Sequence, residues 1–555
     1  MWMSTAVFMM SFKMKTLHIL AGVAAAVCCL SCVESNYKVG GDLVPVGQTY
    51  TFYTVEAPLT DVYVRMADSL SGFSSSRITI GAVRDSEYGL TTRGSVVSLI
   101  PLVDGEMDFG TNPEFKSFHF SAAKDTVSVA SADQASILQT IKVYELSRAV
   151  ETTKDYDCNT PFPHGSKTIT RGTPVFNGED SLSFYFSDEF GKKYMDITAD
   201  DLKDINTYLK KFPGIYIETA EPQGEGGRID MFDLQLDYDS DYGYIEGNYA
   251  KLSFSAEYDG ERKDSSFLFY YGADKFYDLD SLFSSTSSGE YPQYALNLTS
   301  QETGDRVGYA TDKISIEGGG GLKPVISAAQ LKKIAEEAIA SKGGDPKKAV
   351  INKASLVFPF EAPARIEDLD EWPDVLSPTC RIKQDEITRF MGLTDSGSSY
   401  EDQGDINRSV LEYSPDITFH LQELIKIDPD DTSDTKVEKL NKGYYDIWLL
   451  IMADEVITTT TSGSSDLSEM YQYLAYQSYY NDMYGGYGSY GGYSNYYSNY
   501  YNYAMMAAYA SQSTTTSSIS TQLDKDRFYK ATLNGPSAAN GRVPRFEITF
   551  AIPNE

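Results

Sequence analysis

The sequence predicts a mainly β protein built of antiparallel, jelly-roll-like β-sandwich domains with a few short helices. Short runs rich in aromatic and β-branched residues recur along the chain, and several of them alternate polar and apolar residues. Turn-forming residues recur about every 8–12 residues, which is typical of sandwiches and barrels. Alternation with a period of two buries one face of a strand and leaves the other wet, as in antiparallel sheets.

The expected strands follow one another from the N-terminal to the C-terminal end of the chain. Aromatic and β-branched residues dominate residues 50–55, 78–83, 96–102 and 142–146. Alternation is clearest in residues 126–130, in residues 252–258 and near the end in Phe546, Ile548, Phe550 and Ile552.

Two segments carry helical spacing instead. Thr198 is expected to cap a helix over residues 199–211, and Ser327 opens a capping-box pattern before a helix over residues 328–341. Apolar residues recur on one face of each segment, so we expect both helices to pack on a sheet. The glycines at 343–344 end the second helix.

The first residues have the pattern of an exported lipoprotein. Lys13 and Lys15 form a short positive region, and residues 17–30 are almost entirely apolar. Ser31 then supplies a small residue before Cys32. This order is typical of a cleaved signal peptide, and about 14 apolar residues are fewer than the roughly 20 that a membrane span needs. We therefore expect lipid on Cys32, with a plain secretory signal or an uncleaved anchor as the alternatives.

The length of the mature chain predicts more than one domain, because single cores rarely grow beyond about 300 residues. The expected divisions are a signal peptide (1–31), a lipid-anchored linker (32–48), a β-sandwich domain (49–235), a second β-rich domain with the helix near 328–341 (236–457), a Tyr/Gly/Ser/Asn-rich flexible insertion (458–524) and closing strands of the second domain (525–555).

The charge balance excludes one class of partner. Asp and Glu outnumber Lys and Arg by 79 to 47, which gives a formal net charge of −32. Such a surface repels phosphate backbones and anionic headgroups, so we expect no nucleic acid as a partner. Membrane attachment is expected through the lipid anchor, and the remaining partners are envelope proteins or glycans.

Two cysteines remain in the mature chain beside Cys32. Cys158 and Cys380 lie far apart in sequence, and no further cysteines supply a disulfide framework. We expect two unpaired, structural residues, although one disulfide is the alternative in an oxidising envelope.

A tyrosine-rich tract occupies residues 471–509, where fifteen of 39 residues are tyrosine among Gly, Ser and Asn. β-patterned sequence lies on both sides, so the tract is expected to be an insertion between strands. Tyrosine offers a flat apolar ring with a polar tip, which suits contact with carbohydrate, envelope protein or lipid. A tolerated loop is the alternative. The proposed contact residues are Tyr484, Tyr487, Tyr490, Tyr493, Tyr496, Tyr497, Tyr500 and Tyr501.

One acidic segment is a weak calcium candidate. Asp237, Asp239 and Asp241 alternate ahead of Gly243, and calcium prefers several oxygen ligands on a tight loop. The spacing departs from the EF-hand pattern because Asn248 stands where a bidentate glutamate belongs. A solvated acidic hairpin loop is the favoured interpretation, and no cofactor is otherwise expected.

Catalytic patterns are not evident. His119, His164 and His420 do not have metal-ligand spacing, and no Gly-x-Ser-x-Gly occurs. The glycines at residues 318–321 lack a following Gly-Lys-Ser/Thr and are expected to form a flexible connection. Paired carboxylates can hydrolyse glycosides, but a sequence so rich in them does not single out a pair. We therefore expect a protein that is not an enzyme.

Several short segments together resemble a known family. They are SFYFSDEFG at 183–191, KFPGIYI at 211–217, GRIDMF at 227–232, GAVRDSEYG at 81–89, IKVYEL at 141–146 and INKASLVFP at 351–359. By their order and spacing along the chain, these segments resemble the Bacteroidota envelope lipoproteins catalogued as domain of unknown function 4270. The resemblance covers about residue 36 to the C-terminus. It implies a β-rich, outer-membrane lipoprotein and transfers no catalytic residue.

Two further expectations depend on that resemblance. Surface export in this phylum is associated with acidic residues after the lipidated cysteine, and only Glu34 is present, so cell-surface and periplasmic orientation both stay open. Short motifs similar to the phylum's O-glycosylation acceptor occur at Ser69, Thr126, Ser181 and Ser281.

These patterns favour a non-enzymatic outer-membrane lipoprotein that acts in binding or as a structural component of an envelope assembly. The alternatives are a glycan-processing enzyme that uses paired carboxylates, and an accessory subunit of an outer-membrane assembly or transport complex.

Overall fold

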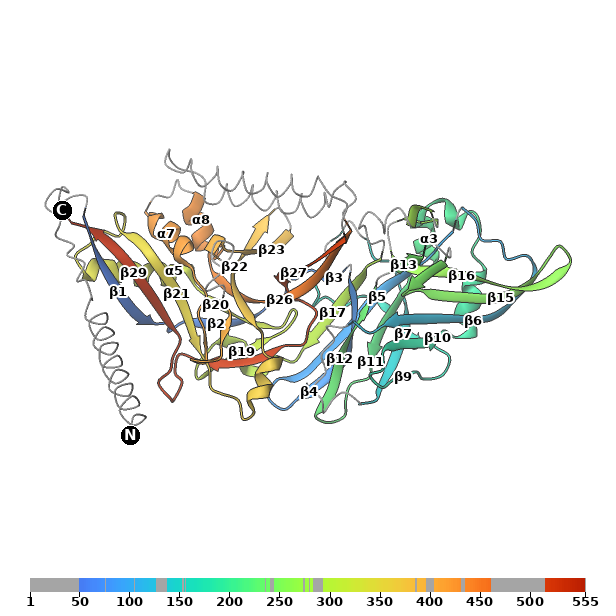
Figure 1. Ribbon diagram of the computed structural model, residues 1–555, viewed down its shortest axis with the longest axis horizontal. Helices are drawn as coiled ribbons and strands as arrows, with labels where there is room; N and C mark the ends of the chain where they lie inside the picture. Colours follow the sequence, from blue (N-terminus) through green and yellow to red (C-terminus); the bar gives the residue numbers. More distant parts are fainter. Residues whose placement is uncertain are drawn as a thin grey trace, which may run out of the picture. The chain divides into compact units, whose positions relative to one another are not determined.

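The computed structural model describes residues 49–74, 76–103, 105–125, 137–151, 154, 156–234, 236–239, 244–272, 275–278, 280–282, 293–384, 387–395, 404–430, 435–460 and 515–554. These residues form a mainly β fold of antiparallel sheets with few helices, which confirms the predicted fold class (Figure 1). The chain separates into two compact units, Met1–Tyr53 with Ala551–Glu555, and Thr54–Phe550. Every described helix and strand lies in the second unit, apart from the ends of β1 and β29.

The largest sheet has 13 strands. They are β3 (Phe73–Ser74), β4 (Arg77–Asp85), β5 (Gly89–Pro101), β6 (Thr111–Ala123), β7 (Gln139–Leu146), β8 (His164–Thr168), β9 (Val175–Phe176), β10 (Ser181–Tyr185), β11 (Ile215–Thr219), β12 (Gly226–Asp233), β15 (Ala250–Tyr258), β16 (Glu261–Gly272) and β17 (Ala295–Gln301). Strand β5 is its centre, because β4, β11, β16 and β17 all pair with it.

The other described strands form four smaller sheets. The seven-stranded sheet contains β2 (Val62–Met66), β18 (Gly308–Tyr309), β20 (Leu322–Ile326), β22 (Val375–Gln384), β23 (Ile387–Gly392), β26 (Ile447–Thr460) and β27 (Thr515–Leu523). The five-stranded sheet contains β1 (Tyr50–Pro58), β21 (Val350–Pro359), β24 (Ile406–Asn407), β25 (Glu412–Tyr413) and β29 (Arg545–Pro553). Two pairs remain, β13 (Leu236–Asp239) with β14 (Tyr244–Gly247), and β19 (Lys313–Glu317) with β28 (Lys530–Asn534).

The described helices are short. They are α2 (Asp188–Met195), α3 (Ile205–Lys211), α5 (Ala328–Ser341), α7 (Thr418–Lys426), α8 (Thr435–Asn441) and the 3₁₀ turns η3 (Asp201–Lys203), η4 (Gly304–Arg306) and η5 (Ile366–Glu371). Among the residues that the structure describes, no helix has both the length and the apolar character needed to cross a membrane.

The two predicted helices have different outcomes. Helix α5 has the predicted bounds, but the Ser327 side chain makes no capping hydrogen bond, and the Ala328 N–H donates instead to Asp446 Oδ1 at 2.9 Å. The predicted helix over 199–211 is divided into η3 and α3. The Asp204 carboxylate accepts from the Thr207 N–H at 3.0 Å and starts the second piece.

The core of the large sheet is aromatic. Phe118 on β6 is fully buried, and its ring lies 4.8 Å from Phe186, 5.1 Å from Tyr194 and 5.1 Å from Phe269, centroid to centroid. These rings come from β6, helix α2, strand β16 and the turn between β10 and α2, so apolar packing joins segments distant in sequence. Rings at such separations add to the stabilisation from area burial alone.

The expected domain division at 235/236 does not coincide with a division between sheets. Strands β15, β16 and β17 follow that position, yet β15 pairs with β6 and both β16 and β17 pair with β5. Near the N-terminus, β2 pairs with β20 in the seven-stranded sheet. Pairing between distant strands therefore overrides the linear order on which the expected division depended.

Strands β26 and β27 bracket residues 461–514. They pair antiparallel from Met452 with Leu523 to Thr460 with Thr515. The tyrosine tract is therefore inserted between two paired strands, as predicted, but β27 lies within the expected insertion of 458–524. The tyrosines of the predicted contact surface lie outside the described residues.

Candidate functional site

A buried polar cluster lies where strands β4, β5 and β17 meet the segment that follows β27. In the ladder, Arg93 of β5 is opposite both Gly81 of β4 and Thr299 of β17. Ser95 on β5 is opposite Asn297 on β17. Because alternate residues of a strand share a face, positions 93 and 95 on β5 and positions 297 and 299 on β17 present their side chains to one side of the sheet.

Asn297 connects the strands to one another. Its Oδ1 accepts from the Thr79 N–H at 3.2 Å and from Ser95 Oγ at 2.5 Å. Its Nδ2 donates to the Arg77 carbonyl at 3.1 Å and to Asp526 Oδ1 at 3.2 Å. An amide with its acceptor and both donors engaged is fixed in one orientation, so Asn297 holds β4, β5 and Asp526 in register.

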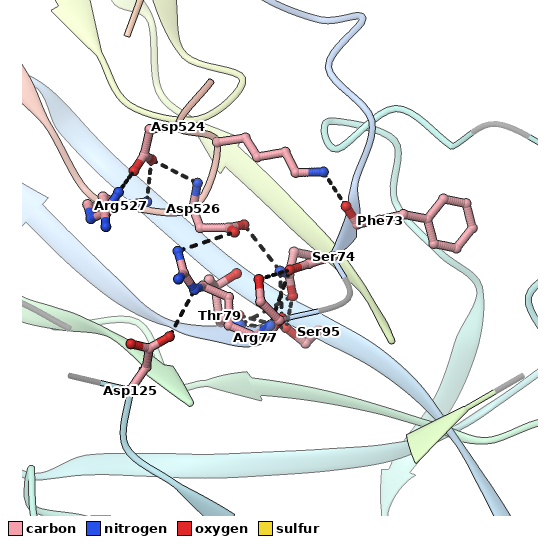
Figure 2. Close-up of polar contacts among 12 residues, drawn as sticks. Phe73, Ser74, Arg77, Thr79, Ser95, Asp125, Asp524, Asp526 and Arg527 are labelled. Carbon is pink, nitrogen blue, oxygen red and sulfur yellow. Dashed lines mark hydrogen bonds and ion pairs between the residues drawn. The ribbon is translucent and has the colours of Figure 1, made fainter. Parts of the chain in front are cut away.

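Arg77 lies between two carboxylates (Figure 2). Its Nε is 2.9 Å from Asp125 Oδ2, and its Nη1 is 4.0 Å from Asp526 Oδ2. Asp526 is buried, and burial raises the pKa of its carboxyl group. Removing one partner from such a buried pair leaves an uncompensated charge, so this contact is costly to break.

Residues 524–527 form a compact turn against the strands. The Asp524 carboxylate accepts from the Arg527 N–H at 2.8 Å and from the Arg527 guanidinium, as Figure 2 shows. Between them, Lys525 Nζ donates to the Ser71 carbonyl at 3.2 Å and to the Phe73 carbonyl. The lysine therefore bonds to backbone oxygens of the β3 region, whereas the carboxylate pairs with an arginine of its own turn.

The glycines at 318–321 form a buried turn, which corrects the predicted flexible connection. The carbonyls of Gly319 and Gly321 accept from Lys323 Nζ at 3.0 and 3.3 Å, and the Glu317 carbonyl is a third acceptor. A Cβ on Gly319 would lie 2.5 Å from Arg93 Nη2, and one on Gly320 would lie 2.1 Å from the Asn159 side chain. The glycines are therefore explained by close packing on the cluster.

Burial changes the titration of two groups beside this turn. Lys323 is 1% exposed, and desolvation lowers the pKa of its ammonium to about 7. Desolvation likewise raises the pKa of the Cys158 thiol to about 11, although the nearby Arg93 charge acts in the opposite direction. At neutral pH the thiol is therefore protonated, which suits a structural residue and not a nucleophile.

A small cavity lies inside the cluster. Its volume is about 10 Å³, which is close to the least that holds one water molecule. The lining consists of Ser71, Gly72, Thr79, Arg93, Cys158, Asn297, Leu298, Thr299, Lys525 and Asp526. Such a space suits a water molecule or a single small ion.

Both predicted structural cysteines are buried and unpaired, as expected. Cys158 packs with Ala67, Leu70 and Trp448. Cys380 is on β22, opposite Ile447 of β26, and burial raises the pKa of its thiol.

The predicted calcium ligands are only partly described. Asp237 and Asp239 are on β13, which forms the expected hairpin with β14, and Asp241 lies outside the described residues. Within the described ranges, no group of three or more His, Cys, Asp or Glu side chains is arranged to hold a metal ion. The calcium site stays a prediction.

His119, His164 and His420 lie in separate places. His119 is partly buried against Tyr185, and His164 stacks between Tyr144 and Tyr216 at 4.7 and 4.8 Å. His420 on α7 is fully buried, and its Nε2 lies 3.0 Å from the Tyr445 carbonyl. Desolvation lowers the pKa of His420 to about 4, so this ring is neutral at physiological pH.

The predicted modification sites also differ in setting. Ser69 accepts a hydrogen bond from Arg381, Ser181 is exposed on β10, and the Ser281 N–H donates to Asp278 at 2.6 Å. Thr126 lies outside the described residues. Cys32, the predicted lipid attachment site, also lies outside them.

Sequence reasoning missed the residues of the polar cluster. Arg77, Arg93, Asn297, Lys323 and Asp526 are single polar residues, four of them in or beside strands and separated by long stretches of chain. The available signal was a lysine inside the otherwise apolar strand β20, close to four consecutive glycines. Buried lysines need several oxygen acceptors, and closely packed glycines expose carbonyls that can provide them.

Comparisons with family models, with curated proteins and with solved structures find no match for this chain. Each described carboxylate of the polar cluster contacts an arginine, and the cavity beside them is small.

Proposed function

We propose that this chain is a lipid-anchored protein of the outer membrane of a Gram-negative cell, acting without catalysis by binding or as a structural component of an envelope assembly. The observation that carries the proposal is the order of charge, apolar run and small residue that ends at Cys32. The resemblance of segments such as 183–191 and 227–232 to envelope lipoproteins of the Bacteroidota supports the same location.

The mainly β structure supports a binding or scaffolding role. Antiparallel sheets with a wide aromatic core give a rigid body on which loops can act. The buried charges described above hold strands together and leave a cavity of one-water size.

Lipid attachment is tested by labelling cells with a palmitate analogue and separating their membranes. The wild-type protein should carry label and sediment with the outer membrane, whereas Cys32→Ser should lose both properties. Cys29→Ser is the matched control, because it removes a neighbouring thiol that the proposed cleavage discards. Label that persists in Cys32→Ser, or is lost equally in Cys29→Ser, would contradict the proposal.

The tyrosine tract is the proposed contact region, with Tyr484, Tyr487, Tyr490, Tyr493, Tyr496, Tyr497, Tyr500 and Tyr501 as its leading residues. Thr460 pairs with Thr515, so a two-residue Asn-Gly turn can replace residues 461–514 and close the hairpin of β26 and β27. Crosslinking in intact cells should lose its protein or glycan partners in this variant.

A second variant distinguishes the effect of the tyrosine rings from the effect of removing the whole segment. It keeps residues 461–514 but replaces the eight tyrosines by serine, and it should lose the same crosslinks if the rings make the contacts. Retention of every crosslink in both variants would refute the contact surface without affecting lipid attachment. Surface protease accessibility in the same cells would distinguish the cell-surface from the periplasmic orientation.

A further inference from the structure

Three residues that line the cavity in the polar cluster carry hydrogen-bonding groups with no partner among the described residues. Arg93 is 3% exposed, and its Nε and Nη2 have no acceptor among the described residues. The hydroxyls of Thr79 and Thr299, which are 1% and 7% exposed, are also unsatisfied. A buried polar group without a partner is costly, so an arrangement of three around one cavity indicates a missing group.

The charges around the cavity are unequal. Glu317, Asp524 and Asp526 pair with Arg306, Arg527 and Arg77 respectively. Within the described part of the chain, Arg93, Lys323 and Lys525 have no carboxylate within ion-pair distance. The two lysines donate to backbone carbonyls instead. Arg93 is therefore a buried cation beside the cavity that no described carboxylate contacts directly, although Asp526 also lines the cavity.

The chemistry of the lining selects the kind of ligand. A guanidinium can only donate hydrogen bonds, and a threonine hydroxyl can donate one, so these groups can all share a single acceptor. The space is small, about 10 Å³, which favours a small acceptor over a bulky one. Ser71 is exposed and Lys525 is partly exposed, so an ion can reach the lining from that side.

We propose that this cavity binds one monatomic anion of the size of chloride, held by Arg93, Thr79 and Thr299. The anion neutralises Arg93 and thereby stabilises the junction of β4, β5 and β17 with the turn at 524–527. This inference is independent of the lipid anchor and of the tyrosine tract.

The first test is thermal unfolding of the purified full-length protein at constant ionic strength, with chloride replaced stepwise by gluconate. Gluconate is a much larger anion than chloride. A ligand that binds only the folded state raises the melting temperature as its concentration rises. We expect the melting temperature to be higher in chloride than in gluconate. It should rise as the chloride concentration passes through the value that half-saturates the site. Equal melting temperatures in the two salts would overturn the proposal.

Variants identify the site. Arg93→Met should abolish the chloride dependence. Because that variant removes a buried cation and can fail to fold, Thr299→Val is the second test, and it should raise the half-saturating chloride concentration about tenfold. Thr219→Val is the matched control, since the Thr219 hydroxyl is equally buried and unsatisfied but does not line the cavity. An equal response of the two threonine variants would contradict the assignment.

Crystals grown in bromide give a direct measurement. Anomalous scattering should show one bromide beside the Arg93 guanidinium and the Thr79 and Thr299 hydroxyls. A bound water without anomalous signal would show that the cavity is a hydration site and overturn the proposal.

Discussion

The aromatic core and the polar cluster lie on strands of the same 13-stranded sheet, but different interactions stabilise their buried side chains. Phe118 contacts a set of rings that need no particular partner atom, so its stabilisation is proportional to buried area. Asn297 instead uses its acceptor and both donors, and each of its contacts requires a named partner. We expect the aromatic core to tolerate the exchange of apolar residues of equal volume. We expect the polar cluster to tolerate few substitutions, because each one removes a hydrogen-bond partner.

The difference concerns specificity as well as stability. Apolar side chains favour many compact arrangements, while a polar cluster that is satisfied in one register penalises the others. Asn297 and Asp526 are separated by 229 positions in the sequence, and their hydrogen bond connects the large sheet to the segment after β27. We infer that the aromatic core supplies most of the stability and that the polar cluster fixes how its segments meet.

The largest expected effect is in the aromatic core. Phe118→Ala should lower the free energy of unfolding by about 3–5 kcal/mol, because it removes a fully buried ring and leaves a cavity among Phe186, Tyr194 and Phe269. Denaturant titration measures the loss. Tyr185→Ala, on the neighbouring strand but 47% exposed, should cost less than about 1 kcal/mol and is the control. Equal losses would mean that the rings around Phe118 do not form the core.

The second-largest effect is a pH dependence of stability that we expect from the polar cluster and not from the aromatic core. The pKa of buried Lys323 is lowered to about 7, whereas an unfolded lysine titrates near roughly 10.4. Between these values the unfolded chain binds more protons, so stability should rise with pH by up to about 1.4 kcal/mol per unit and be lost as pH falls toward 7.

Denaturant titrations at pH 7, 8 and 9 measure this slope. Lys323→Met should flatten it, and Lys333→Met should not, because Lys333 is exposed on α5. The Phe118→Ala variant should keep the slope of the wild type despite its lower stability. A slope that survives Lys323→Met would assign the pH dependence to other groups.

A smaller effect tests the glycine turn. Gly320→Ala would place a Cβ 2.1 Å from Asn159 Oδ1 and 2.7 Å from Cys158 Sγ, and overpacking of this kind typically costs about 1–3 kcal/mol. Gly224→Ala is the control, because nothing lies within 4 Å of its added Cβ. Thermal unfolding compares the two. If both variants have the melting temperature of the wild type, the turn accommodates the added methyl group without loss of stability. Close packing would then not explain the glycines.

The sequence predicts the aromatic region better than the polar one, for a physical reason. Alternation at residues 252–258 is a local property, and β15 follows it with Leu252, Phe254 and Ala256 buried. Strand pairing is not local. The sequence does not indicate that β15 joins β6, or that β2 joins β20, which is why the expected division at 235/236 does not follow the sheets.

The polar cluster has no local pattern at all. Ser95, Asn297 and Asp526 are ordinary polar residues until folding brings them together. The glycines at 318–321 were visible, but a glycine run has two physical meanings, conformational freedom and close approach of another group. Only the positions of Arg93 and Asn159 against these glycines decide between the two.

The smallest expected effect concerns helix α5, where a distant polar group again replaces a local one. The sequence assigns its cap to Ser327, yet that side chain makes no capping bond and Asp446 accepts from the Ala328 N–H. Ser327→Ala should therefore change the free energy of unfolding by only a few tenths of a kcal/mol, whereas Asp446→Ala should cost about 0.5–2 kcal/mol. Denaturant titration of both variants measures the difference. A larger loss in Ser327→Ala would mean that the local cap operates, and that remote polar contacts determine the structure only at the buried cluster.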